Sequence, residues 1–296
     1  MAVKCLKKLK GIERSQIIVF DNGSSNEAFE VLQEKYRDEH NVAVGCSACN
    51  LGFSEGNNAA YRFALTIHHD YDYVVCMNSD VMIHQKGFLD LLEDYAKQDE
   101  YAILGPDAFN SQRRFHESPQ HLALPSTKTL SAAIKECEDN IRNKELVAQL
   151  QKQSDAKAII ASHLPSFFVF LYRTLWVFPR RALQGIKAEC DYRKTYTDPL
   201  LAGCCIVFFK KYLKNEKVLF EPDTFLYGEE MLLHLKCKTK GYKMIYDPKL
   251  KIEHKEAIST KADSKSYVEY VEKRNALQRK ALVKVQQCMA NNPWIK

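Results

Sequence analysis

The sequence QIIVFDNGSSN, residues 16–26, joins a short apolar run to a cluster of turn-forming residues. A continuous apolar run of this length is typical of a strand that is buried on both faces of a sheet. The DNGSSN that follows favours a turn leading into the N-terminus of a helix. The same succession recurs along the chain, as helix 28–36, strand 42–44, polar loop 50–58, helix 59–68 and strand 73–77. This alternation predicts an α/β fold in which helices flank a largely parallel sheet.

Three polar clusters directly follow the predicted strands, at residues 21–25, 50–58 and 78–80. In open α/β sheets, ligands bind beyond the carboxyl ends of the strands. We therefore expect the three clusters to meet on one edge of the sheet and to form a binding site there.

Periodicity and apolar runs predict the remaining elements. We expect a helix over the first sixteen residues, a long polar helix over 126–158, a strand within 200–211, a loop, helix, strand and strand over 225–255, and a closing helix over 264–288.

The apolar, aromatic segment 165–181 allows two interpretations. Arg173 interrupts it, and its uncharged runs are far shorter than the roughly twenty residues that span a bilayer. It either packs as a helix on the main domain or lies in a membrane interface, with Arg180 and Arg181 near lipid headgroups. The chain from residue 261 carries eight Lys or Arg against three Asp or Glu, which indicates either a solvated helix face or contact with acidic lipid.

Composition narrows the class of partner. The chain has 296 residues, with 43 Lys and Arg against 37 Asp and Glu, a net charge of +6. This small positive net charge suits an anionic small substrate or an acidic membrane surface, and no nucleic-acid-binding motif is present. Ten cysteines occur singly or in apolar runs, which favours a reducing compartment, and the CxxC of Cys46 and Cys49 has no second pair at metal-site spacing. Because the first residues lack the apolar stretch of a signal peptide, we expect a cytoplasmic location, peripheral at the inner face of the membrane if the lipid contacts form.

Six sequence blocks, in this order, resemble the family 2 glycosyltransferases and in particular their rhamnosyltransferase-like branch. The blocks are IIVFDNGSSN (17–26), NLGFSEGNN (50–58), YVVCMNSDV (73–81), LAGCCIVFFKK (201–211), FLYGEEMLLHLKCKTKGY (225–242) and IEHK (252–255), with a weaker echo at EKRN (272–275). The resemblance implies the GT-A fold with a helical insertion and a C-terminal helix. It divides the chain into a nucleotide-sugar-binding half (1–106), a helical insertion that is a candidate for facing a membrane (107–198), an acceptor and catalytic half (199–258) and a basic C-terminal helix (259–296).

The resemblance implies a metal site. Asn78-Ser79-Asp80 stands where the family has its Asp-containing metal motif, and His254 stands at the place of a second ligand near the diphosphate. The expected cofactor is Mg²⁺ or Mn²⁺, since such cations prefer carboxylate oxygen and neutralise the charge that gathers on a diphosphate leaving group. The alternatives are an Asp that caps the following helix and a histidine with a purely structural role.

The resemblance also implies a catalytic base. Tyr227-Gly228-Glu229-Glu230 matches the family's Tyr-Gly-Glu-Asp block, and Glu230 occupies the place of the catalytic Asp. Because Glu is one methylene longer than Asp, the geometry of the base must differ here. Glu229 is expected to contact the acceptor or support the loop. The alternative is that both carboxylates only stabilise the first turn of a helix through its dipole.

Donor and acceptor contacts are expected from the neighbouring blocks. Asp21 and Asn22 are candidates for contact with the base and ribose, Asn78 and Ser79 for contact with the ribose or phosphate, and the loop from Gly52 to Asn58 is expected to lie under the nucleotide. Gly203 and Tyr227 are candidates on the acceptor side. The alternative for the glycine-bearing loops is that they are ordinary turns.

The predicted function is an inverting transfer from a UDP- or dTDP-sugar to a hydroxyl of a glycan or lipid-linked acceptor, as in polysaccharide biosynthesis. The family normally opens with a strand that ends in a Thr-x-Asn type of turn, whereas this sequence begins inside the helix that should follow it. We therefore expect weak donor binding and slow turnover. The competing hypothesis is a non-catalytic glycosyltransferase-like protein that acts as a binding module in glycan assembly.

Overall fold

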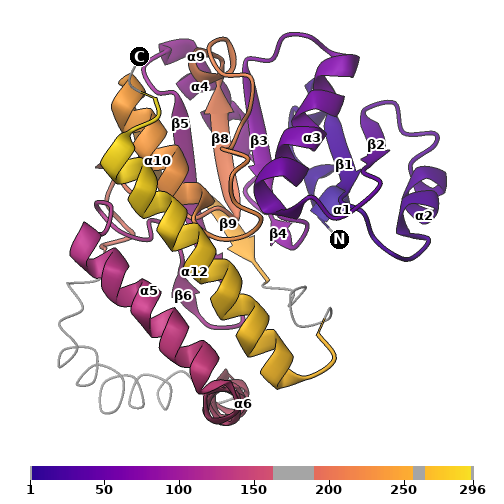
Figure 1. The fold of residues 1–296 in the computed structure, drawn as a ribbon. Helices are drawn as coiled ribbons and strands as arrows, with labels where there is room; N and C mark the ends of the chain where they lie inside the picture. Colours follow the sequence, from indigo (N-terminus) through magenta and orange to yellow (C-terminus); the bar gives the residue numbers. More distant parts are fainter. Residues whose placement is uncertain (1, 163–189, 256–263, 295–296) are drawn as a thin grey trace.

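The computed structural model describes residues 2–162, 190–255 and 264–294 and shows an α/β fold in which helices surround two sheets (Figure 1). In chain order the helices are α1 (Ala2–Leu6), the 3₁₀ turn η1 (Ile12–Arg14), α2 (Ala28–Lys35), α3 (Gly52–Ile67), α4 (Phe88–Gln98), α5 (Thr127–Arg142), α6 (Lys144–Ser162), α9 (Lys210–Leu213), α10 (Glu229–Lys240) and α12 (Tyr267–Asn291). The strands are β1 (Ile17–Asp21), β2 (Val42–Cys46), β3 (Tyr73–Met77), β4 (Val81–Met82), β5 (Ile103–Asn110), β6 (Phe115–His116), β7 (Tyr196–Thr197), β8 (Cys205–Phe209) and β9 (Met244–His254).

The strands form two separate sheets within the described residues. β1 and β2 pair in parallel, and the larger sheet has the order β3-β8-β5-β9-β4, with β6 on β5 and β7 on β9. In the larger sheet β5 and β9 run parallel, whereas the pairs β3–β8, β8–β5 and β9–β4 are antiparallel. The expectation of a largely parallel sheet is therefore confirmed for β1–β2 and β5–β9 and wrong for the other pairs. Apolar runs report burial on both faces, and burial does not fix the direction in which neighbouring strands run.

Strand β8, which lies between β3 and β5, shows how the sheet is covered on both faces. Val207 and Phe209 belong to a buried cluster with α4, while Ile206 and Phe208 belong to a second buried cluster with α3 and α10. Successive side chains of a strand point to opposite faces, so one apolar strand serves both clusters. Gly203 lies two residues before this strand, so the buried strand fixes its position at the end of the sheet.

Helices α5 and α12 lie side by side across the front of the larger sheet (Figure 1). Each helix begins with a serine, Ser126 or Ser266, whose hydroxyl accepts a hydrogen bond from a backbone N–H of the first turn. Leu130 of α5, Leu232 of α10 and Leu282 of α12 form a further buried cluster. This packing holds α12 against the beginning of α10, which is the segment that carries the two predicted catalytic glutamates.

Several predicted elements differ from those observed. The expected helix over residues 1–16 ends at Leu6, and the predicted helix 126–158 is two helices separated at Asn143. The two strands expected after α10 are one continuous strand, β9, whose pairing with β5 shifts after Pro106. The segment 165–181 lies outside the described residues. Within the described ranges, no helix combines the length and the apolar character needed to cross a bilayer.

The predicted polar loop 50–58 is wrong for most of its length, because α3 begins at Gly52. Gly52 has a φ of 79°, a conformation that favours glycine, and its N–H donates to the side-chain oxygen of Asn50 at 2.9 Å. The N–H of Phe53 donates to the carbonyl of Phe225 at 2.7 Å. Polar residues thus form the first two turns of the helix, since two of its first N–H groups have partners outside it.

Candidate active site

The pairing of β4 with β9 brings Asp80 beside His254. Val81 lies opposite His254 in this antiparallel pair, and the N–H of Lys255 donates to the backbone carbonyl of Asp80 at 3.1 Å. The Asp80 Oδ1 and His254 Nε2 atoms are 3.4 Å apart, and both side chains are largely buried. The two residues expected to be metal ligands are therefore neighbours, although 174 positions separate them in the sequence.

Glu117, directly after β6, completes this group and was not predicted from the sequence. Its Oε2 atom lies 2.6 Å from Nδ1 of His254, and its Oε1 atom accepts a hydrogen bond from the Asn110 side chain at 2.7 Å. The Cys204 thiol is also close, since ligand atoms of Glu117, Cys204 and His254 all lie within 4.8 Å of one another. Nothing in the local sequence RFHESP indicates that Glu117 belongs to a site. Only its contact with His254 identifies it as a site residue.

The electrostatics of this group suit a cation. Hydrogen bonds to Asp80 and Glu117 raise the pKa of His254 to about 10, so the imidazolium balances the two carboxylates in the protein alone. Carboxylate oxygens and an imidazole nitrogen are ligands of divalent cations such as Mn²⁺, and oxygen ligands also suit Mg²⁺. The residues present therefore fit a divalent cation that replaces the proton of the imidazole.

Glu230 lies in the first turn of α10 and points toward β8. Its Oε1 atom accepts a hydrogen bond from the N–H of Gly203 at 3.1 Å and one from the Gln120 side chain at 3.4 Å. Gly203 leaves room for the longer side chain, because a Cβ at this position would lie 2.6 Å from the same Oε1 atom. Gln120 is a second site residue that the sequence did not indicate.

Burial makes the carboxyl groups of both glutamates weaker acids than usual. It raises the pKa of Glu230, and burial followed by the charge of Glu230 raises the pKa of Glu229 to about 8. Glu229 is only 5% exposed, and its Oε2 atom has no hydrogen-bond partner. A carboxylate with a raised pKa is a better proton acceptor than an ordinary one, which is the property that a general base requires.

The metal group and the base lie around the same thiol. The pKa of Cys204 is raised well above its usual value by burial first and then by neighbouring charges, which include Glu117, Glu230 and Asp80. The geometry agrees, because Glu230 bonds the N–H of Gly203, and the thiol of the next residue, Cys204, lies within 4.8 Å of ligand atoms of Glu117 and His254. The structure thus brings together Asp80, His254 and Glu230, which the sequence predicted to act jointly.

The predicted donor residues Asn22 and Gly52 also meet. The Asn22 side chain donates to the Gly52 carbonyl at 2.8 Å and accepts from the N–H of Leu51 at 3.1 Å. A Cβ on Gly52 would lie 2.2 Å from the carbonyl oxygen of Phe225, just before Tyr227. The beginning of α3 therefore contacts the segment that leads into the catalytic glutamates.

The remaining predicted residues have different surroundings. Asn58 is 1% exposed, and its amide bonds the backbone of Leu219 and Phe220. The Asp21 carboxylate accepts hydrogen bonds from Ser24. Asn78 is half-buried and Ser79 is exposed beside Asp80, while Tyr227 has a φ of 72° and a pKa raised by burial.

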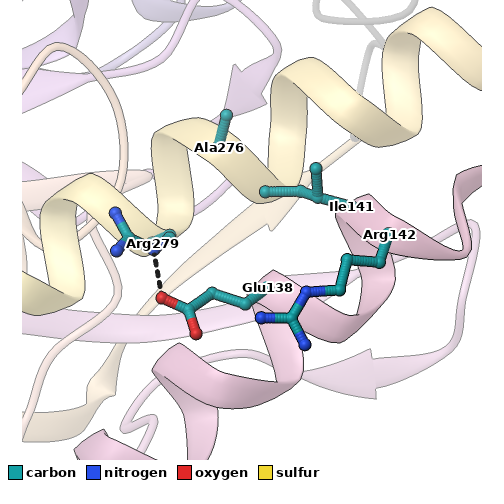
Figure 2. A pocket seen from close by; sticks show the side chains of 5 residues that line it. All are labelled: Glu138, Ile141, Arg142, Ala276 and Arg279. Atoms are coloured by element: carbon teal, nitrogen blue, oxygen red, sulfur yellow. Dashed lines mark hydrogen bonds and ion pairs between the residues drawn. The ribbon is translucent and has the colours of Figure 1, made fainter.

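Two surface cavities lie apart from this group. One, of about 420 Å³, lies between α5 and α12, where Arg279 bonds Glu138 at 2.7 Å (Figure 2). The other, of about 700 Å³, lies beside the irregular part of β9 and is lined in part by Asp107, Tyr192 and Lys249. Neither is lined by any residue that was predicted to bind the donor, the acceptor or the metal.

A comparison with protein-family sequence models agrees with the sequence resemblance. Residues 2–215 match the sequence model of glycosyl transferase family 2. Among solved structures, the chain is similar to the crystal structure of GalNAc-T7 with UDP, GalNAc and Mn²⁺, with 10% identity and a TM-score of 0.47. The match covers 87% of this chain and 40% of that chain, so this chain spans well under half of that protein. No curated protein matches the chain.

Proposed function

We propose that this chain, which belongs to glycosyl transferase family 2 and has the GT-A fold, is an inverting enzyme with Glu230 as its base. Membership of this family implies glycosyl transfer, with a nucleotide-sugar donor and a glycan acceptor. The proposed donor is a UDP- or dTDP-sugar, hexosyl or rhamnosyl, and the proposed acceptor is a hydroxyl of a glycan or of a lipid-linked glycan. The observation that carries the proposal is the half-buried Glu230 carboxylate bonded to the N–H of Gly203, next to Cys204, whose thiol lies near Glu117 and His254.

Glu230 is proposed to take the proton of the acceptor hydroxyl as that oxygen attacks the anomeric carbon. The N–H of Gly203 and the Gln120 amide hold one carboxylate oxygen in place, and burial keeps the group basic. A single displacement of this kind inverts the anomeric configuration, because the acceptor enters opposite to the leaving diphosphate.

Asp80 and His254 are the proposed ligands of a divalent cation, Mg²⁺ or Mn²⁺. When bound, such a cation neutralises the charge of the diphosphate leaving group. The side chains of Asn22, Asn78 and Ser79 and the backbone at Gly52 are proposed to face the nucleotide. Asp21 is a further proposed donor residue, whereas Asn58, which is buried and bonds the backbone of Leu219 and Phe220, is proposed to support the donor segment from within.

The assay that tests the proposal is metal-dependent hydrolysis of a panel of UDP- and dTDP-sugars, followed by transfer to glycan acceptors. Glu230→Gln should lower kcat by roughly 10²–10⁴-fold, because it removes the general base. Glu229→Gln is the matched control: it is a neighbouring buried glutamate with the same change, and the proposal gives it no proton-transfer step. Wild-type turnover in a folded Glu230→Gln variant would remove the assigned role.

One observation favours the second candidate, a binding module without catalytic activity. Within the described residues β1 pairs with β2 and β3 pairs with β8, so the strands of the donor half belong to two separate sheets. Mn²⁺-dependent thermal stabilisation by a nucleotide-sugar without any turnover would support this candidate.

A further inference from the structure

We infer that Glu117 is a positioning residue that turns His254 so that its Nε2 atom, together with Asp80, faces the cation. The inference rests on the proposed function, which assigns the cation to Asp80 and His254. Glu117 is given no contact with the cation, the donor or the acceptor; it acts through the imidazole ring.

The two ring nitrogens of His254 have carboxylates at different distances. Asp80 Oδ1 lies 3.4 Å from Nε2, whereas Glu117 Oε2 lies 2.6 Å from Nδ1. Two ligands that are each roughly 2.1 Å from a cation stand about 3.0 Å apart at an octahedral angle and about 3.4 Å apart at a tetrahedral angle. The Asp80–Nε2 separation can therefore admit a cation, while the Glu117–Nδ1 separation is that of a hydrogen bond.

The hydrogen bond to Glu117 determines which ring nitrogen is available. A carboxylate can only accept, so Nδ1 carries the hydrogen of this bond. With Nδ1 holding this hydrogen, a neutral His254 would present the lone pair of Nε2 on the side of Asp80, where it could hold a cation. A histidine ligand that donates its second N–H to a carboxylate is a common way of fixing both tautomer and ring orientation.

Glu117 is itself held by rigid elements. Its other oxygen accepts from Asn110, which is fully buried and lies opposite His254 in the parallel pairing of β5 with β9. The Asn110 side-chain oxygen accepts from the N–H of Arg113 at 2.8 Å. The relay from Asn110 through Glu117 to His254 is thus built on two adjacent strands, which position a ligand better than a loop does.

A competing arrangement uses the thiol. Because Glu117, Cys204 and His254 have ligand atoms within 4.8 Å of one another, they could hold a cation without Asp80. That arrangement would make Glu117 a ligand and end its hydrogen-bonding role. The two arrangements predict different responses to substitution, so they can be separated.

The test is the binding of Mn²⁺ alone, without nucleotide, measured from the loss of the electron paramagnetic resonance signal of free Mn²⁺. Glu117→Ala should weaken binding by about 10–100-fold, the usual effect of removing such an outer partner. Glu117→Gln should lose clearly less affinity than Glu117→Ala, because the amide oxygen can still accept from Nδ1, although the new NH₂ group then faces the Asn110 NH₂ that Glu117 accepts from in the wild type. Asp80→Ala should weaken binding at least as much as Glu117→Ala.

Glu253→Ala is the matched control. Glu253 precedes His254 on the same strand and also pairs with a histidine, His84, at 2.9 Å. Its removal should leave Mn²⁺ affinity unchanged, and urea unfolding should show that each variant is folded. Wild-type affinity in Glu117→Ala, or equal losses in Glu117→Ala and Glu117→Gln, would overturn the inference.

Co²⁺ provides the second measurement. Binding through Asp80 and His254 should give no thiolate-to-cobalt absorption in the near ultraviolet. If the wild type showed such a band and Cys204→Ser did not, the thiol would be a ligand and the inference would be overturned. Because neither measurement uses a sugar donor, failure of the inference is distinct from failure of the proposed function, which donor turnover reports.

Discussion

Replacing Gly203 by alanine should displace the proposed base while leaving the fold intact. A Cβ at position 203 would lie 2.6 Å from Glu230 Oε1 and 3.1 Å from its Cδ atom. The backbone of Gly203 is not in the positive-φ region that disfavours alanine, so the substitution acts through this contact alone. The perturbation is therefore aimed at a single carboxylate.

The size of the displacement follows from the distances. Ordinary contact begins at 3.4 Å, so the carboxylate oxygen must move by 3.4 − 2.6 = 0.8 Å. The same movement stretches its 3.1 Å hydrogen bond with the Gly203 N–H beyond hydrogen-bonding range. A shift of about 1 Å at a reacting group costs roughly 100-fold in rate, and overpacking of this kind costs about 1–3 kcal/mol of stability.

The assay compares kcat for donor hydrolysis in Gly203→Ala and in Gly87→Ala at a temperature where both are folded. Gly87 is the matched control because a Cβ there meets only Asp90 Oδ2, at 4.0 Å. Adding Glu230→Asp to Gly203→Ala should recover part of the lost rate, since the shorter side chain withdraws the carboxylate from the new methyl group. A folded Gly203→Ala enzyme with kcat within threefold of the wild type would refute the reasoning.

Three further predictions concern stability. The folded-state pKa of Glu229 is raised from 4.5 to about 8, so its contribution to the free energy of unfolding is present below about pH 4.5 and is lost as pH rises toward 8. Glu229→Gln should therefore remove a loss of stability on the order of a few kcal/mol over this pH range in urea unfolding. Parallel pH profiles of the variant and the wild type would contradict this. Lys236→Ala should cost about 1.5–3 kcal/mol, because the buried ammonium bonds both Glu216 and Glu221, while Lys240 and Tyr242 still bond Glu216 in the variant. The exposed Lys243→Ala should cost less than about 1 kcal/mol, and equal losses on denaturant titration would refute the distinction. Asn58→Ala should cost about 2–4 kcal/mol, since its buried amide bonds three backbone groups, and a midpoint of unfolding equal to that of the wild type would contradict this.

Local sequence determined most of the strands and helices of the donor half. The run YVVCM predicts the strand 73–77 with the bounds that the structure shows, since apolar residues end at polar, turn-forming neighbours on both sides. The resemblance to family 2 glycosyltransferases, carried by short blocks such as DNGSS and MNSD, agrees with the family match over residues 2–215, whereas the YGEE block at 227–230 lies beyond the matched residues. These features depend on residues that are close together in the sequence, where periodicity and turn chemistry act.

Tertiary structure alone decided the partners of these residues. Glu117 meets His254 across 137 positions, and Gln120 meets Glu230 across 110, through an order of strands that no local pattern records. The polar residues at 52–58 became helix because Asn50 and the Phe225 carbonyl accept its first N–H groups. Hydrophobic periodicity reports which face of an element is buried, whereas the side chains that meet at its end depend on sheet order, strand direction and register.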